Sequence, residues 1–219
     1  MTSSDIRSRA RQTLEGKWGV AVLAAFLAAL LGGLATGNGF SIEIDEDWLK
    51  SLPRIVRAYL GVALSVGGIL GLAQFILGGV VQLGYSRFLL DMHDGKEAEV
   101  SDLFSQFDRF GDGFCLNLLR GIFIFLWSLL LVIPGIVASF SYSMAHFIMV
   151  ENPNMTASEA LKASKELMDG HKWDLFCLNL SFIGWILLCI LTLGIGYLWL
   201  EPYMNAAHAA FYRSIRGGE

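Results

Sequence analysis

The sequence predicts an all-α, polytopic membrane protein with about six transmembrane helices. The helices are expected to form three helical hairpins, each preceded by a cytoplasmic amphipathic helix at the membrane interface. The first observation is that the 219 residues are 54% hydrophobic and 16% charged, whereas a soluble domain is typically about 25% charged. The second is that uncharged stretches of about 20 residues, the length of one membrane crossing, recur along the chain. The third is an internal repeat in the C-terminal half.

Length and composition exclude several classes of protein. Six crossings use about 120 residues, so only short connections remain, and residues 1–219 are expected to form a single integral membrane domain. A net charge of −4 argues against a nucleic-acid-binding protein, because such proteins present basic surfaces to phosphates. An odd number of cysteines, three, argues against a disulfide scaffold.

The first hairpin is predicted from two uncharged stretches. Residues 18–37 carry no charge and end in Gly37-Asn38-Gly39, a helix-breaking run. A cleaved signal peptide is the alternative for this stretch, because Ala35-Thr36-Gly37 resembles a cleavage site, but 20 residues are long for such a segment. An acidic polar loop over residues 38–57 follows. The Gly-rich stretch over residues 58–83 is the second span.

Two further hairpins are predicted in the C-terminal half. In each, a long apolar stretch meets helix-breaking residues and a shorter apolar stretch returns. The return stretches are shorter than the usual crossing of about 20 residues, so a re-entrant hairpin remains the alternative to a full pair of spans. The spans and their turns are residues 114–133, Pro134 with Gly135, residues 136–150, residues 175–193, Gly194 with Gly196, and residues 197–212.

The distribution of basic residues predicts that both termini are cytoplasmic. Lysine and arginine near the spans stay on the cytoplasmic side of a membrane, and twelve of them lie on one side of the predicted spans against three on the other. Arg120 lies inside the third span, where its long side chain is expected to extend to the headgroups. Both termini, and the three predicted amphipathic helices, are therefore placed inside.

An internal repeat links the two C-terminal hairpins. The run Phe114-Cys115-Leu116-Asn117-Leu118 recurs as Phe176-Cys177-Leu178-Asn179-Leu180, an offset of 62 residues that also aligns His146 with His208. We expect the two asparagines to form hydrogen bonds between helices, as polar side chains in membranes do.

The repeat extends upstream of each hairpin. Amphipathic stretches with helical spacing lie over residues 5–14, 100–110 and 158–168. An elbow follows the first and the third stretch, formed by Gly16, Lys17 and Trp18 and by Gly170, Lys172 and Trp173. The chain is thus predicted to contain three modules, over approximately residues 1–90, 91–152 and 153–216.

Polar groups inside the predicted spans are the candidate functional residues, because unpaired polar groups in lipid are costly. Glu201, followed by Pro202, is the first candidate, for lining a polar cavity or binding a proton or cation; its alternative role is to reach the outer interface. His146, His208 and Arg120 are the other candidates. No pair of these histidines and the cysteines has the spacing of a zinc site, so neither a metal nor another cofactor is expected.

Specific motifs carry a resemblance to a known family. They include Gly84-Tyr85-Ser86-Arg87-Phe88, residues 125–136, Glu151-Asn152-Pro153, residues 164–173 and residues 180–185. With these motifs the chain resembles an uncharacterised family of small multipass bacterial membrane proteins, the domain of unknown function number 975. The resemblance implies a cytoplasmic-membrane protein with about six helices and supplies no activity or catalytic residue. His146 departs from the family pattern, where a proline is expected.

Two functions are consistent with the sequence. The first is a non-enzymatic factor that organises the membrane, assists assembly or responds to envelope stress by binding lipid or partner proteins. The alternative is a small transporter, or a transporter subunit, with a polar path lined by Glu201, Gln74, Gln82 and Arg120. An enzyme is not expected, since no catalytic motif is present; the alternative is an enzyme that acts on a lipid or an intramembrane peptide, with Glu201, His146 and His208 as its acid or base groups. The expected partners are the lipid bilayer and other membrane proteins or further copies of the chain, and not nucleic acid.

Overall fold

The computed structural model describes residues 3–32, 76–192 and 196–217. The end of the first predicted span, the acidic loop, most of the second span with Gln74, and Gly194 lie outside these residues. Every regular element in the described ranges is helical. The elements are α1 (Ser3–Leu14), α2 (Trp18–Gly32), a helix over residues 76–93, the 3₁₀ helices η1 (Val100–Phe104) and η2 (Phe107–Arg109), α5 (Phe110–Leu130), α6 (Val132–Ser141), α7 (Ala145–Glu151), α8 (Ala157–Leu167), α9 (Lys172–Leu180), α10 (Ile183–Leu191) and α11 (Tyr197–Gly217).

Three helical stretches of the described residues are long and apolar enough to cross a membrane. They are Val100–Leu130, Ile133–Glu151 and Lys172–Leu191, and the apolar part of α2, Trp18–Ala29, is shorter. The all-helical class is confirmed, and the apolar helices fit a membrane protein. The count of six spans in three hairpins stays a prediction.

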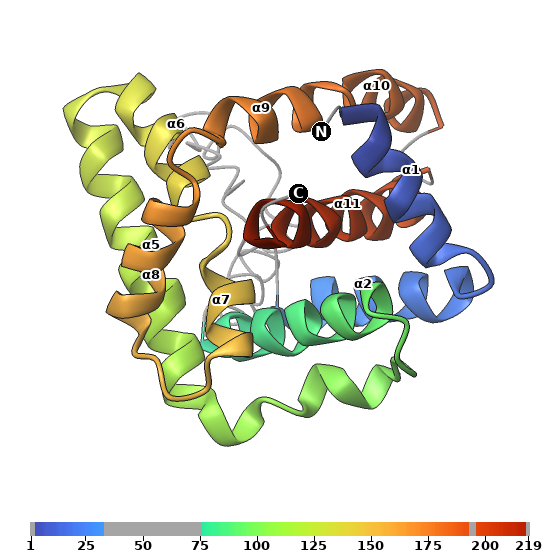
Figure 1. Cartoon of the computed structure of the whole chain (residues 1–219), viewed down its shortest axis with the longest axis horizontal. Helices are drawn as coiled ribbons and strands as arrows, with labels where there is room; N and C mark the ends of the chain where they lie inside the picture. The colour runs from blue at the N-terminus through green and yellow to red at the C-terminus, as the bar shows by residue number, and fades with distance from the viewer. Residues whose placement is uncertain (1–2, 33–75, 193–195, 218–219) are drawn as a thin grey trace, which may run out of the picture.

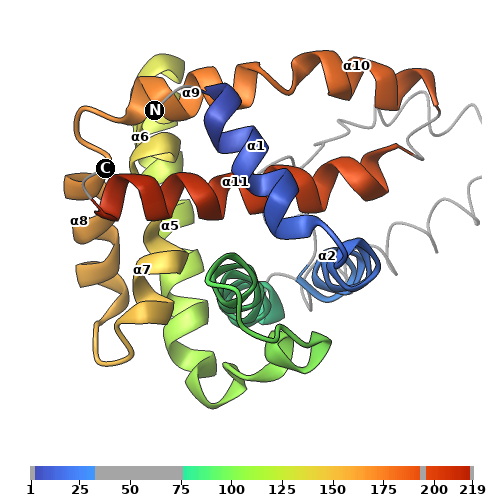
Figure 2. The same cartoon turned by 45° about the vertical axis from the view of Figure 1, so that its right-hand side comes forward.

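Helix α11 is the centre of the fold. It runs through the middle of the molecule in both views, with α9 and α10 along one side and the 76–93 helix along the other (Figures 1 and 2). It packs against α1, α2 and α10, and its small residues Ala206, Ala207, Ala209 and Ala210 are at most 2% exposed. Small side chains allow neighbouring helices to approach closely. From Leu200 onward α11 is largely covered by protein, and this part of the helix also carries polar side chains.

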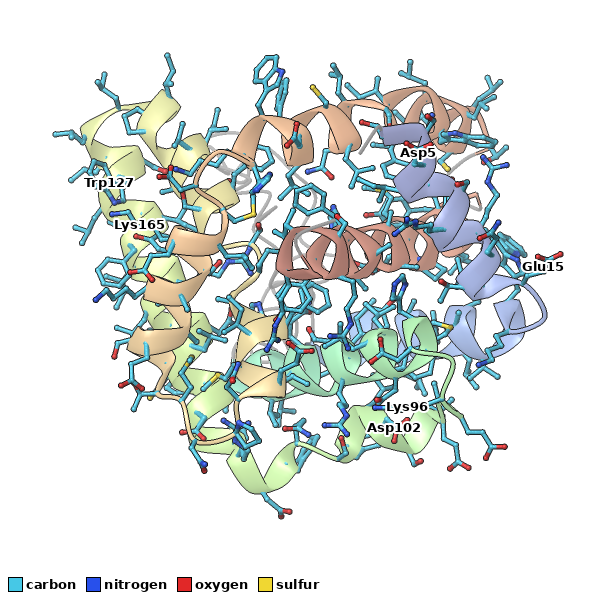
Figure 3. The ribbon with its side chains drawn as sticks, viewed as in Figure 1. Asp5, Glu15, Lys96, Asp102, Trp127 and Lys165 are labelled. Atoms are coloured by element: carbon cyan, nitrogen blue, oxygen red, sulfur yellow. The ribbon has the colours of Figure 1, made fainter. Side chains whose placement is uncertain are left out.

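The surface of α5, α6 and α10, unlike that of α11 from Leu200 onward, is exposed and apolar. Large apolar side chains on α5, α6 and α10 point away from the protein, with exposed fractions of 75% for Leu129, 75% for Ile133 and 81% for Leu191. Trp127 projects from the outer side of α5 (Figure 3). A continuous apolar surface of this kind is rare on soluble monomers and is typical of a surface that contacts lipid.

The two hairpins are interrupted at different places. In the second module α5 is continuous and the return helix breaks between α6 and α7, whereas in the third module the break lies between α9 and α10 and α11 is continuous. A serine hydroxyl near each break donates a hydrogen bond to a carbonyl three residues earlier, Ser143 to Phe140 (2.7 Å) and Ser181 to Leu178 (2.6 Å). Such bonds compete with the helical backbone ladder. At the offset of 62 residues the unbroken helices carry Asn205 and Leu119 instead.

The first and third amphipathic segments, predicted to lie at the membrane interface, pack their apolar faces on protein. In α1 the apolar residues Ile6, Ala10 and Leu14 are at most 3% exposed, and the helix packs on α11 and α9. Helix α8 packs on α5 and α7, and η1 packs on α2. Each segment therefore packs on helices that are distant from it in the sequence.

The second amphipathic segment is not an α-helix, contrary to the prediction. It forms the short 3₁₀ helices η1 and η2, with Phe104 48% exposed and Phe107 38% exposed. Ser101, Asp102 and Ser105 all occur in this segment, and such residues bond to nearby backbone in place of the helical ladder. The segment therefore lies just before α5, as predicted, but its backbone forms 3₁₀ helices in place of an α-helix.

Two span boundaries also differ from the prediction. The helix that contains the end of the second span continues past Leu83 to residue 93. The turn between α5 and α6 lies at Leu131, which has extended backbone angles, and not at Pro134. Pro134 falls in the first turn of α6, where the missing backbone N–H is not needed.

Candidate functional site

A stripe of polar side chains runs along one face of α11. Glu201, Asn205, His208 and Tyr212 follow one another at intervals of three or four residues, which places them on successive turns of the same face. Polar residues inside a membrane helix are candidates for function, because lipid offers them no hydrogen-bond partners. Each residue of the stripe has different neighbours.

His208 is paired in the middle of the stripe. Its Nε2 atom lies 2.8 Å from Oδ1 of Asn179 on α9, and because an amide oxygen only accepts, the imidazole donates. This is the interhelical hydrogen bond that the sequence predicts for Asn179. No such bond is made by the equivalent Asn117 in the described residues.

His146 occupies the equivalent place on α7 without a partner. The side chain is 3% exposed, and its Nε2 atom makes no hydrogen bond within the described ranges. Its position follows from a bond between modules. The Ser164 hydroxyl of α8 donates to the Ser141 carbonyl at the end of α6 (2.8 Å), which supports the break from which α7 starts.

The third candidate, Arg120, acts electrostatically on both histidines. Its charge interacts with both His146 and His208. The Nε atom is enclosed and has no hydrogen-bond partner, and none of the ion pairs among the described residues involves this guanidinium. The Arg120 side chain is partly buried, and its extension to the headgroups stays a prediction.

Glu201 lies at the other end of the stripe, next to Pro202 inside α11. It is partly buried and interacts electrostatically with Tyr85 of the 76–93 helix. The Tyr85 hydroxyl is enclosed, and it faces the Asn205 side chain, the next residue of the stripe. The candidate residues thus form two groups, Glu201 with Tyr85 and Arg120 with the histidines.

An ionic cluster lies at the Tyr212 end of the stripe. Arg213 of α11 pairs with Asp94, which follows the 76–93 helix, at 2.5 Å, and it also pairs with Glu151 of α7. Glu151 further accepts a hydrogen bond from the Tyr212 hydroxyl at 2.5 Å and pairs with Arg216. The cluster therefore joins α11 to α7 and to the segment that follows the 76–93 helix.

Sequence reasoning missed this cluster, although the repeat held the signal for it. At the offset of 62 residues Glu151 aligns with Arg213, so equivalent positions of two modules carry opposite charges. Opposite charges at equivalent positions indicate a contact when the modules pack around a common centre. The prediction used the repeat to find similar residues and did not compare the residues that differ.

The predicted elbows are turns at the starts of α2 and α9. Gly16 has a φ of +78° and Gly170 a φ of +83°, a region that glycine adopts at little cost. Lys17 donates to the Lys96 carbonyl at 3.2 Å, Trp18 begins α2, and Lys172 pairs with Asp169 at 3.6 Å. Trp173 is 70% exposed, as a side chain at the headgroup level would be. A cavity of about 300 Å³ lies beside Lys17, and its other lining residues are Val20, Phe88, Met92, Glu97, Ala98 and Glu99.

The glycines of the predicted hairpin turns serve close packing. A Cβ atom on Gly135 would lie 2.1 Å from Oγ of Ser128 on α5, and one on Gly196 would lie 2.9 Å from Sγ of Cys189 on α10. Both glycines therefore bring the two helices of their hairpin together. Among the described residues no group of three histidine, cysteine or acidic side chains is placed to hold a metal ion.

Comparison with known proteins gives one family. The family model described as "Protein of unknown function (DUF975)" matches residues 1–138 and residues 128–219. The two matches together extend over the whole chain. Neither the curated proteins nor the solved structures contain a match.

Proposed function

The chain belongs to the DUF975 family of proteins of unknown function, and from this premise we propose that it is a non-enzymatic protein that organises the membrane or assists assembly in it. Its site of action is the bacterial cytoplasmic membrane, with both termini cytoplasmic. The hairpins contact the lipid bilayer, and the partners are other membrane proteins or further copies of the chain. Nucleic acid is not a partner.

The close packing around α11 supports this proposal most strongly. Ala207 and Ala209 are 0% exposed, and Leu200 and Tyr203 are at most 7% exposed. A path for a solute needs a row of side chains that water can reach, whereas these residues pack on neighbouring helices. The large apolar surfaces lie on the outside of α5, α6 and α10, where a membrane-organising protein contacts lipid and partners.

The contacts between modules also support a rigid body that acts as a scaffold. The Arg7 guanidinium of α1 donates to the Ser181 carbonyl at the α9–α10 break (3.3 Å), as Ser164 of α8 does at the break after α6. The cluster of Asp94, Glu151 and Arg213 joins the second and third modules again. Bonds that link all three modules restrict the relative movements that alternating access requires.

Water access to α11 tests the proposal. In a protein with Cys115, Cys177 and Cys189 replaced by serine, Ala207→Cys is treated in membranes with a small charged thiol reagent. We expect no modification, because the position is packed on all sides. The matched control is Lys165→Cys on α8, which is exposed and should react fully. Reaction of the Ala207 variant at the rate of the control would show a water-filled interior and contradict the proposal.

A transporter is the second candidate, favoured by the polar stripe on α11. Tyr85, whose hydroxyl is enclosed, interacts with both Glu201 and Asn205 of the stripe. If this group forms part of a path, proteoliposomes containing the protein leak or exchange a solute, and Glu201→Gln abolishes that flux. The scaffold proposal predicts the same low flux for the wild type, the variant and protein-free liposomes.

The proposed topology has six spans, with the hairpin turns on the outer face. In the same cysteine-free background, Pro134→Cys and Gly196→Cys on intact cells should both react with an impermeant thiol reagent. Lys165→Cys, which is proposed to be cytoplasmic, should react only after the cells are opened. Protection of both turn positions on intact cells would contradict six full spans.

A further inference from the structure

A cavity of about 300 Å³ beside the start of α2 combines charges of both signs with an apolar floor. Its lining among the described residues consists of Lys17, Val20, Phe88, Met92, Glu97, Ala98 and Glu99. We propose that this cavity binds the headgroup of a zwitterionic phospholipid with a primary ammonium, as in phosphatidylethanolamine. The proposal rests on the proposed membrane location, and it holds equally for a scaffold and for a transporter.

A loop folded back at the end of the 76–93 helix forms one wall of the cavity. Gly95 has a φ of +76°, a region that glycine adopts at little cost, and the chain reverses there. The Lys96 backbone N–H donates to the Asp91 carbonyl at 2.9 Å, and the Lys96 ammonium pairs with the Asp91 carboxylate at 2.9 Å. The Lys17 ammonium donates to the Lys96 carbonyl at 3.2 Å. The loop is therefore held both by the helix that it follows and by the residue before α2.

Buried apolar side chains form the floor of the cavity. Phe88 is 0% exposed and Met92 is 3% exposed, and their spacing of four residues places them on one face of the helix. The Phe88 ring stacks on Tyr85, with 6.2 Å between the ring centroids. A volume of about 300 Å³ is at the small end of ligand pockets, which suits a headgroup and not a whole lipid.

The charged side chains of the cavity match the two charges of the headgroup. Glu97 forms no ion pair within the described ranges. Glu99 accepts a hydrogen bond from the Ser101 hydroxyl at 3.0 Å, and a carboxylate has further lone pairs to offer. The Lys17 ammonium has three N–H donors, of which the Lys96 carbonyl takes one. A primary ammonium can therefore donate to the carboxylates while the phosphate of the same headgroup accepts from Lys17.

Other headgroups fit these charges less well. The quaternary ammonium of phosphatidylcholine has no N–H group to donate to Glu97 or Glu99. An anionic headgroup, such as that of phosphatidylglycerol, meets two carboxylates and one ammonium, so the net charge of the lining repels it. The expected preference is therefore for phosphatidylethanolamine over both.

Exposed apolar side chains of α2 lead away from the cavity and favour a lipid over a free headgroup. Val20 lines the cavity, and Leu23 and Phe26 follow it at intervals of three residues, which keeps them on adjoining parts of the helix surface. The exposed fractions are 39% for Val20, 50% for Leu23 and 48% for Phe26. An acyl chain can lie along this stripe while its headgroup occupies the cavity, whereas free phosphoethanolamine makes no use of the stripe.

Thermal unfolding of the purified full-length protein in an uncharged detergent tests the site. Phosphatidylethanolamine, phosphatidylcholine and phosphatidylglycerol with identical acyl chains are added to the micelles in separate titrations. A fourth titration uses free phosphoethanolamine. Tryptophan fluorescence follows unfolding, and a ligand that binds only the folded state raises the melting temperature with its concentration.

The wild-type melting temperature is expected to rise and saturate with phosphatidylethanolamine at a concentration about tenfold lower than with the other two lipids, the effect of about one charge-assisted hydrogen bond. Glu97→Gln, which changes an exposed side chain and should fold normally, weakens binding by about tenfold and reduces the preference over phosphatidylglycerol. Lys17→Gln weakens binding by a similar factor. Ala98→Leu, which narrows the cavity without changing its charge, weakens binding of all three lipids. Glu166→Gln on α8, also exposed, is the matched control and leaves binding unchanged.

Equal titrations with the three lipids would overturn the proposal, and so would a Glu97→Gln variant that titrates like the wild type. Saturation with free phosphoethanolamine at the concentration that suffices for the lipid would overturn the assignment to a lipid. None of these results alters the thiol accessibility of positions 134, 196 and 207, which tests the proposed topology and function separately.

Discussion

The second and third modules carry a histidine at the same repeat position and surround it differently. His208 is hydrogen-bonded to Asn179, whereas His146 is enclosed without a partner among the described residues. The third module breaks its first helix and keeps its second continuous, and the second module does the reverse. The comparison teaches that the repeat sets which residues reach the centre, while the position of the helix break determines which of them meet.

Two further contacts depend on differences between the modules. Arg120 aligns with Phe182, which is 0% exposed, so a charge in one module replaces a packed aromatic ring in the other. Glu151 aligns with Arg213, and the two form an ion pair. Positions at which the repeats diverge therefore supply Arg120 and the ion pair of the cluster, whereas the two histidines stand at a position at which the repeats agree.

The largest expected effect compares the glycines of the two hairpins. Gly135→Ala places a Cβ atom 2.1 Å from Oγ and 2.9 Å from Cα of Ser128, whereas Gly196→Ala meets Sγ of Cys189 at 2.9 Å and the Cα of Cys189 only at 3.4 Å. Overpacking of this kind costs about 1–3 kcal/mol. We expect Gly135→Ala to lie at the upper end of that range and Gly196→Ala at the lower end.

Equilibrium unfolding in detergent measures both glycine variants against the wild type. Gly121→Ala on α5, where a Cβ atom meets nothing within 4 Å, is the matched control and should not be destabilised. If Gly196→Ala lost more stability than Gly135→Ala, the close approach of α6 to α5 would not be the tighter of the two.

The histidines should respond in opposite directions to the same substitution. His208→Leu leaves the Asn179 side chain unpaired, which costs about 1–3 kcal/mol. His146→Leu removes a buried polar group without a partner among the described residues, so the free energy of unfolding should stay equal or rise. Both variants are measured by chemical unfolding in the same detergent buffer. Equal losses for the two variants would contradict the different surroundings of the histidines.

The support of the helix breaks should give a smaller effect. Ser164→Ala removes the hydrogen bond to the Ser141 carbonyl (2.8 Å) and should cost about 1 kcal/mol. Arg7→Ala removes the longer bond to the Ser181 carbonyl (3.3 Å) and should cost less. Hydrogen exchange of the amides after each break reports whether the loss is local. An effect confined to α1 for Arg7→Ala would show that this bond does not support α9 and α10.

The smallest effect is a pH dependence at Asp91, which lies near the end of the 76–93 helix. Partial burial acts to raise the pKa of Asp91, but hydrogen bonds from Lys96 and Arg87 outweigh it and hold the pKa below its ordinary value. The carboxylate therefore stabilises the fold above its unfolded pKa, and this contribution is lost as the pH falls through the lower folded pKa. Asp91→Asn should reduce the difference in melting temperature between neutral and acidic buffer; an unchanged difference would show that Asp91 contributes nothing.

Most of the helices could be predicted from the sequence, but few of the contacts between helices could. The apolar stretches and the elbow at Gly170 fall close to the ends of α5, α9 and α11, because hydropathy and breaking residues act within a few positions of the chain. The break after Ser181 was not predicted, since a single serine inside an apolar run is also common in unbroken membrane helices. Docking of α1 on α11 was missed because an amphipathic face does not reveal whether lipid or protein covers it.

The candidate residues were found individually and their grouping was not. Glu201, His146, His208 and Arg120 are polar residues in apolar runs, which hydropathy alone identifies. That Arg120 acts on both histidines, while Glu201 meets Tyr85, depends on how α5, α7 and α11 pack. Such contacts join residues far apart in the sequence, and no local pattern encodes them.

A structure of the protein in lipid nanodiscs tests the central claim most directly, namely that the bundle around α11 is closed. The account predicts that Ala206, Ala207, Ala209 and Ala210 pack against neighbouring helices, with no column of water joining Glu201 to either membrane face. A continuous water-filled cavity that opens at Glu201 would contradict the scaffold proposal and favour transport.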